Sequence, residues 1–201
     1  PITVSHKIVN RSGQNWQGQM FGQLKRDNSE DPGKSDQGIF TLGTFLGGAW
    51  GSPDEHYNKL KFANFNDEKL SVEAKGGWVA MVQHYFVSAW VPGELKLTQA
   101  EGQPFAAKLE SRKSNDDMNI IGFTSPTINV PAGTAAEVDA TFYSGPKIQS
   151  ELKDLAVGLN QTVDYGWLWP IAKLLFLGLQ FFHGLIGNWG WSIIVLTLLV
   201  K

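Results

Sequence analysis

The sequence predicts an all-β domain followed by a short helical region that associates with a membrane. Apolar and polar residues alternate with a period of two through much of the first two-thirds of the chain, which is typical of strands with one buried face. Clusters of turn-forming residues separate these segments, and a long apolar stretch follows them. A chain of 201 residues can bury one sizeable core, so a single main domain is expected.

Many strands of modest length joined by short turns favour two sheets packed face to face. The alternating segments are 2–8, 16–24, 70–74, 105–109 and 136–142. The predicted turns are Asp27 to Gly38, Gly47-Gly48, Asn115 to Asp117 and Pro131 to Gly133. Residues 78–82 and 85–91 are apolar almost without interruption, which predicts strands buried on both faces.

Two helices are expected within this β-rich part. Ser52, Pro53 and Glu55 form a capping-box pattern, so a helix of one or two turns is predicted from Ser52 through Leu60. Leu152, Leu155 and Leu159, together with Ile148, recur at helical spacing after Gly145-Pro146. This pattern predicts an amphipathic helix that packs on the domain.

The chemistry changes at Tyr165, after which Lys173 is the single charged residue before Lys201. Gly187-Asn188 divides this stretch into two predicted helices. The first could cross the membrane, or it could lie in the interface plane with tryptophans at headgroup depth; its apolar run is short for crossing, which favours the second arrangement. The interfacial tryptophans are Trp167, Trp169, Trp189 and Trp191. The second helix begins a membrane span, and the apolar run that stops at Lys201 predicts that the chain is a fragment.

Composition excludes several functions. The net charge of -2 gives no sign of the basic surface that nucleic-acid binding requires. The absence of cysteine excludes a disulfide framework and a thiolate metal site. The four histidines are scattered, so His84 is predicted to be a structural histidine, and neither a catalytic centre, a metal site nor a cofactor is expected.

An ordered series of motifs resembles the YidC family of membrane protein insertases, which includes the Oxa and Alb proteins. The motifs are Ser52 to Tyr57 with Lys61-Phe62, Lys75 to Met81, Tyr85-Phe86, Trp90 to Pro92, Gly145 to Lys147, Val163 to Trp169 and His183 to Ile194. The resemblance covers nearly the whole chain. It implies a periplasmic β-supersandwich similar to galactose mutarotases, an interfacial helix and the start of the second transmembrane helix.

The resemblance also implies the domain boundaries and the cellular setting. Residues 1–145 would form an N-terminally truncated periplasmic β-domain, 146–164 an amphipathic helix and linker, 165–188 the interfacial helix, and 189–201 the start of a transmembrane helix. The protein would be a multi-pass protein of the inner membrane. It would insert and help to fold nascent membrane proteins, alone or with the Sec translocon and its accessory proteins, and would not be an enzyme.

Lys201 is the candidate functional residue. In the family a basic residue at this position projects into a hydrophilic groove that receives substrate, and the resemblance assigns that role to Lys201. The other interpretation is a lysine that snorkels at a helix end. Two alternatives to insertion also stay open: a periplasmic docking scaffold for Sec accessory proteins, and a carbohydrate-binding or mutarotase-like module.

Overall fold

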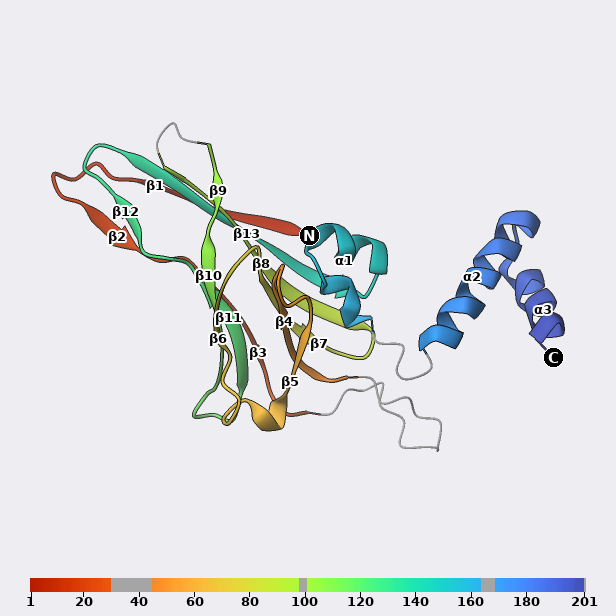
Figure 1. The fold of residues 1–201 in the computed structure, drawn as a ribbon. Coiled ribbons are helices and arrows are strands. Elements are labelled where there is room, and N and C mark those ends of the chain that lie inside the picture. The colour runs from red at the N-terminus through yellow and green to blue at the C-terminus, as the bar shows by residue number, and fades with distance from the viewer. Residues whose placement is uncertain (30–44, 98–100, 164–168, 201) are drawn as a thin grey trace. The chain divides into compact units, whose positions relative to one another are not determined.

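The computed structural model describes residues 1–29, 45–97, 101–163 and 169–200, and the chain divides into two compact units (Figure 1). One unit, called here the β-unit, holds the strands with α1 and η2. The other, called the hairpin, holds α2 and α3.

Within the described residues, the β-unit contains a seven-stranded antiparallel sheet in the order β1-β13-β8-β7-β4-β5, with β9 paired to β8. A second, four-stranded sheet has the order β3-β11-β10-β6, and β2 pairs with β12 in a separate ribbon. The strands of the first sheet are β1 (Ile2–Val9), β4 (Gly47–Gly51), β5 (Asn58–Lys61), β7 (Trp78–Val82), β8 (Phe86–Leu97), β9 (Gln103–Pro104) and β13 (Ala135–Pro146). The others are β2 (Trp16–Gly18), β3 (Phe21–Arg26), β6 (Ser71–Lys75), β10 (Ala106–Lys113), β11 (Asn119–Thr124) and β12 (Ile128–Val130).

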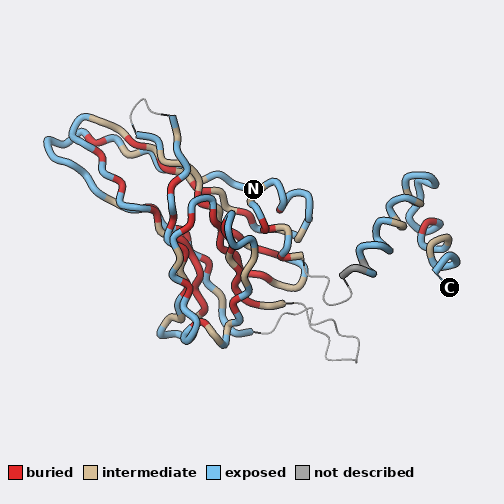
Figure 2. The backbone as a smooth tube through the Cα atoms, viewed as in Figure 1, coloured by how far each residue is buried: buried red, intermediate tan, exposed pale blue. Residues whose placement is uncertain are grey.

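The main core lies between the two sheets. Leu109 and Ile121 from the four-stranded sheet and Val79 from the seven-stranded sheet are fully buried there. Burial runs along the inner faces of both sheets (Figure 2). The prediction of an all-β sandwich is therefore confirmed.

A second core covers the opposite face of the seven-stranded sheet. All five residues of β7 are buried: Val79 and Met81 belong to the main core, whereas Trp78, Ala80 and Val82 belong to the second. Helix α1 (Gln149–Leu155) and the short 3-10 helix η2 (Leu159–Thr162) supply Leu152 and Leu159 to this second core. The near-continuous apolar run of β7 is thus explained by burial on both faces.

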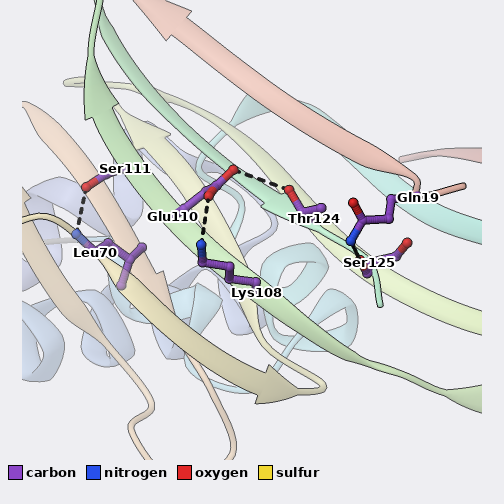
Figure 3. Close-up of polar contacts among 7 residues, drawn as sticks. All are labelled: Gln19, Leu70, Lys108, Glu110, Ser111, Thr124 and Ser125. Carbon is purple, nitrogen blue, oxygen red and sulfur yellow. Dashed lines mark hydrogen bonds and ion pairs between the residues drawn. The ribbon is translucent and has the colours of Figure 1, made fainter. Parts of the chain in front are cut away.

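Polar contacts tie neighbouring strands of the four-stranded sheet together (Figure 3). The carboxylate of Glu110 in β10 accepts a hydrogen bond from Thr124 of β11 at 3.2 Å, and it also pairs with Lys108 of its own strand at 3.5 Å. The Ser111 hydroxyl accepts the backbone N–H of Leu70 at 2.9 Å. An exposed ion pair such as Lys108–Glu110 contributes little to stability. The stability of this sheet therefore comes mainly from the apolar residues on its buried face.

The helix predicted from Ser52 through Leu60 is wrong. The Ser52 hydroxyl does accept the backbone N–H of Glu55 at 3.0 Å, as a cap would, but the chain makes only a turn. The next residues form β5, because Asn58–Lys61 pair with Gly47–Trp50 of β4. Pairing with a neighbouring strand outweighs the local helix signal here.

Two other local predictions need correction. Gly47-Gly48 is not a turn but the start of β4, which pairs with the edge strand β5 on one side and with β7 on the other. The single helix predicted from Ile148 to Leu159 is interrupted: α1 ends at Leu155, and Gly158 adopts the left-handed conformation before η2. The turns at Asn115 to Asp117 and Pro131 to Gly133 are confirmed. Most of the turn predicted from Asp27 to Gly38 lies outside the described residues.

Candidate membrane-binding surface

The hairpin consists of α2 (Trp169–Ile186) and α3 (Trp189–Val200). The predicted break at Gly187-Asn188 is confirmed, and its hydrogen bonds explain it. The backbone N–H of Gly187 donates to the carbonyl of His183 at 2.7 Å and ends α2. The Asn188 side-chain oxygen accepts the backbone N–H of Gly190 at 2.9 Å and caps α3.

The two helices pack against each other along one side of each. Gly178 of α2 lies so close to α3 that a Cβ there would be 3.2 Å from Leu196. Ser192 of α3 is fully buried, and its hydroxyl donates to the carbonyl of Asn188 at 2.7 Å. The rings of His183 and Trp189 stack with centroids 3.8 Å apart and an interplanar angle of 17°. The buried Ser192 hydroxyl therefore has its hydrogen-bond partner within the hairpin.

Two polar residues of α2, Lys173 and Gln180, lie on the side facing away from α3, whereas His183 stacks on Trp189 at the helix contact. Gly178, Leu179 and Phe182 are half-buried at the helix contact, whereas Lys173 and Gln180 are exposed. At about 100° per residue, Lys173 and Phe182 lie on opposite sides of the helix. Lys173 and Gln180 therefore mark a polar stripe along one side of α2, which they share with Leu177, and the rest of the exposed surface of the hairpin is largely apolar.

That apolar surface is extensive. Its exposed members on α2 are Ile171, Leu174, Leu175, Phe176, Leu177, Phe181, Leu185 and Ile186. On α3 they are Trp189, Trp191, Ile193, Ile194, Leu198, Leu199 and Val200. Contiguous exposed apolar surfaces mark protein or membrane contact sites, and the scarcity of charge, with Lys173 the sole charged residue between 165 and 200, favours lipid.

The structure places two of the predicted interfacial tryptophans. Trp189 and Trp191 are 49% and 61% exposed at the start of α3. Trp169 begins α2, but its side chain lies outside the described residues, as do Trp167 and Lys201. The stacking of His183 on Trp189 was not predicted, since the sequence places these residues on two different helices.

Neither α2 nor α3, among the helices that the structure describes, is both long and apolar enough to cross a membrane. Helix α2 has 18 residues with Lys173, Gln180 and His183 among them, and α3 has 12 described residues.

Other candidate sites lie in the β-unit. His84 is half-buried in the turn between β7 and β8, where its ring contacts Tyr85 edge to face at 4.1 Å. A groove of about 550 Å³ is walled by Trp50, Asp54, Glu55 and Glu73, among others. The described residues include no group of three or more His, Cys, Asp or Glu side chains placed to hold a metal ion.

The chain matches the family model of the YidC periplasmic domain over residues 1–177. It is 48% identical over 200 residues to the membrane protein insertase YidC of Pseudomonas aeruginosa strain LESB58, covering 100% of this chain and 33% of that protein. It is 48% identical to the protein of the same name from Pseudomonas putida strain W619 and 46% identical to that of Stutzerimonas stutzeri strain A1501, each over 200 residues.

The chain thus spans about a third of the length of these relatives, 33% or 34% in each case. The family model covers all the strands of the β-unit and ends within α2. The chain therefore belongs to the YidC family and contains its periplasmic domain.

Proposed function

We propose that this chain is part of a non-enzymatic membrane protein insertase, in which the hairpin joins the β-unit to the bilayer. The observation that carries the proposal is the apolar surface of α2 and α3 on a chain whose relatives are named membrane protein insertases. The substrates would be nascent membrane proteins. The Sec translocon and its accessory proteins are proposed as partners, and the inner membrane as the location.

The placement of polar residues supports an interfacial α2. With Lys173 and Gln180 on the side away from α3, the helix can lie along the membrane surface with this stripe in water. The opposite side and α3 then meet the acyl chains. Trp189 and Trp191, exposed at the start of α3, suit the headgroup region, where amphipathic rings collect.

Lys201 follows the apolar run of α3 directly. A cation at bilayer depth costs about 2.5–3.5 kcal/mol, so it persists only where it meets water or a partner. In a water-filled groove the lysine could receive the polar or acidic part of an entering segment and lower the barrier to its transfer. The lysine ammonium cannot form the bidentate hydrogen bonds that an arginine guanidinium forms. Lys201 is therefore expected to act on the substrate through its positive charge alone.

The test is insertion of a single-span substrate by the full-length protein reconstituted in lipid vesicles. Lys201→Glu should lower the insertion rate at least about tenfold, the effect of losing an interaction of about 1.4 kcal/mol. Lys201→Arg is the matched control and should retain activity because the positive charge remains. Wild-type insertion by the Lys201→Glu protein would refute the role of Lys201.

A further inference from the structure

A groove of the β-unit, called here the acidic groove, runs along one edge of the four-stranded sheet. It is the groove of about 550 Å³ that Trp50, Asp54, Glu55 and Glu73 help to wall. Residues Val72 to Lys75 of β6 line it in succession, whereas no described residue of β10 does. The groove therefore follows the edge of β6 that faces away from β10.

That edge of β6 is open. In the order β3-β11-β10-β6 this strand comes last, and among the described residues it pairs with β10 alone, from Ser71 opposite Glu110 to Lys75 opposite Ala106. Alternate residues of an edge strand direct their backbone N–H and C=O groups outward, where an extended peptide can add as a further strand. A groove along such an edge therefore suits an extended chain better than a compact ligand.

One wall of the acidic groove is apolar. Trp50 and Val72 line this wall, and both are half-buried where they pack against the main core. Successive side chains of an added strand point to opposite faces, so every second side chain of a bound segment would meet the apolar wall. The groove therefore favours a segment in which apolar and polar residues alternate.

The rim of the groove is acidic. The exposed residues Asp54, Glu55 and Glu73 line it, and Lys75 carries the one ammonium group among its described lining residues. Lys108 of β10 lies opposite Glu73, but its ammonium pairs with a carboxylate of its own strand at 3.5 Å (Figure 3). Opposite charges select a partner and like charges repel it, so the polar residues of the bound segment should be lysine or arginine.

We propose that the acidic groove binds an extended, basic segment of a partner protein, which adds to the open edge of β6 as a further strand. Lysine or arginine side chains on one face of the segment would lie near Asp54 and Glu73, and apolar side chains on its other face would contact Trp50. This inference goes beyond the proposed function, which assigns no role to the groove. It concerns the β-unit alone, so it holds whether or not the hairpin enters a membrane.

The experiment measures peptide binding to the full-length protein in nanodiscs of phosphatidylcholine, which carry no net lipid charge. The probe is a fluorescein-labelled hexapeptide of alternating arginine and valine, and its comparison has glutamate in place of arginine. Fluorescence anisotropy should give the arginine peptide a Kd below about 1 mM. The glutamate peptide should bind at least about tenfold more weakly, and added salt should weaken the arginine peptide further.

A pair of double variants places the binding in the groove. Asp54→Asn with Glu73→Gln should weaken the arginine peptide at least about tenfold. Asp116→Asn with Asp154→Asn is the matched control, because it removes the same charge from two exposed residues that do not line the groove. The control should bind like the wild type. Urea midpoints close to that of the wild type verify that both variants fold.

Pairing with the edge of β6 is tested by methylating the backbone of the probe. One peptide is methylated on its valine amides and the other on its arginine amides. Because only alternate N–H groups of an added strand face its neighbour, one of the two should lose binding at least about tenfold and the other should keep it. Binding of both as tight as that of the unmodified peptide would overturn the pairing.

Three further results would overturn the inference. The first is no binding of the arginine peptide up to about 1 mM. The second is equal binding of the arginine and glutamate peptides. The third is equal affinity of the two double variants for the arginine peptide. None of these measurements reads insertion, so failure here is distinct from failure of the proposed function.

Discussion

At the scale of single residues, one exposed ion pair should make a small part of the stability of the β-unit depend on pH. Asp117, in the turn between β10 and β11, pairs with Lys113 at 2.5 Å and accepts a hydrogen bond from Asn28 at 2.6 Å. The hydrogen bond and charge of Lys113, with Asn28 adding to them, hold the pKa of Asp117 below its usual value of 3.8. A depressed carboxyl pKa stabilises the fold above the unfolded-state pKa, and this stabilisation is lost as the pH falls through the folded-state pKa.

Asp117→Asn should therefore remove a pH-dependent part of the stability. The wild type should have the larger free energy of unfolding near neutral pH, and the difference should shrink as the pH falls below 3.8. Asparagine tolerates the left-handed backbone at this position, where φ is 60°. Urea unfolding at a series of pH values measures the difference.

Lys113→Met is the paired control, since it removes the partner and leaves the carboxyl in place. It should lose the larger part of the pH-dependent stabilisation, because the hydrogen bond from Asn28 remains. A difference between the wild type and Asp117→Asn that stays constant down to about pH 2 would contradict the assignment.

Residue contacts at the candidate site were only partly predictable. Trp189 and Trp191 are exposed, and aromatic residues beside an apolar run are typical of membrane interfaces, but their interfacial role stays a prediction. The burial of Ser192 and the stacking of His183 on Trp189 could not be predicted, because both depend on how α3 folds back on α2. The roles of Lys201, Trp167 and Trp169 stay predictions as well.

At the scale of elements, close packing between the sheets explains Gly48. A Cβ at this position of β4 would lie 2.8 Å from the ring of Phe65 and 3.3 Å from Ile121, both fully buried. Gly48→Ala should therefore overpack the main core and destabilise the β-unit by about 1–3 kcal/mol. Gly13→Ala, where a Cβ meets nothing within 4 Å, serves as control, and equal effects of the two on the urea midpoint would rule out overpacking.

The sequence predicts elements well where the pattern reflects burial and poorly where it reflects local propensity. The continuous apolar run 78–82 correctly indicated a strand covered on both faces, because its residues supply two cores. The capping box at Ser52 was misleading, because β4 offered the following residues a strand partner. Gly47-Gly48 likewise suggested a turn, whereas tight inter-sheet contact is the actual reason for a glycine at Gly48.

The orientation of α2 can be tested by cysteine accessibility in membranes. Gln180 and Leu185 are both exposed in the hairpin, so any difference between them must come from lipid. A membrane-impermeant thiol reagent should label Gln180→Cys from the side of the β-unit and should label Leu185→Cys slowly. As a control, the two cysteine variants should react at the same rate in urea. If both cysteines are equally protected from the reagent in vesicles, α2 crosses the bilayer instead of lying at its surface.

At the scale of the whole molecule, the features that identify the family and the features proposed to carry the mechanism lie in different units. The β-unit supplies most of the family match, which covers residues 1–177. Its buried side chains form the two cores on either side of the seven-stranded sheet. The hairpin supplies the apolar surface. We therefore expect insertion to depend on the membrane part of the protein.

Deleting residues 1–145 from the full-length protein, with everything after them retained, tests this expectation most directly. The measurement is the rate at which a single-span substrate enters vesicles containing the deleted or the intact protein. The account predicts a rate close to that of the intact protein. A loss of insertion as severe as that expected for Lys201→Glu, in a deleted protein that still reaches the membrane, would contradict it.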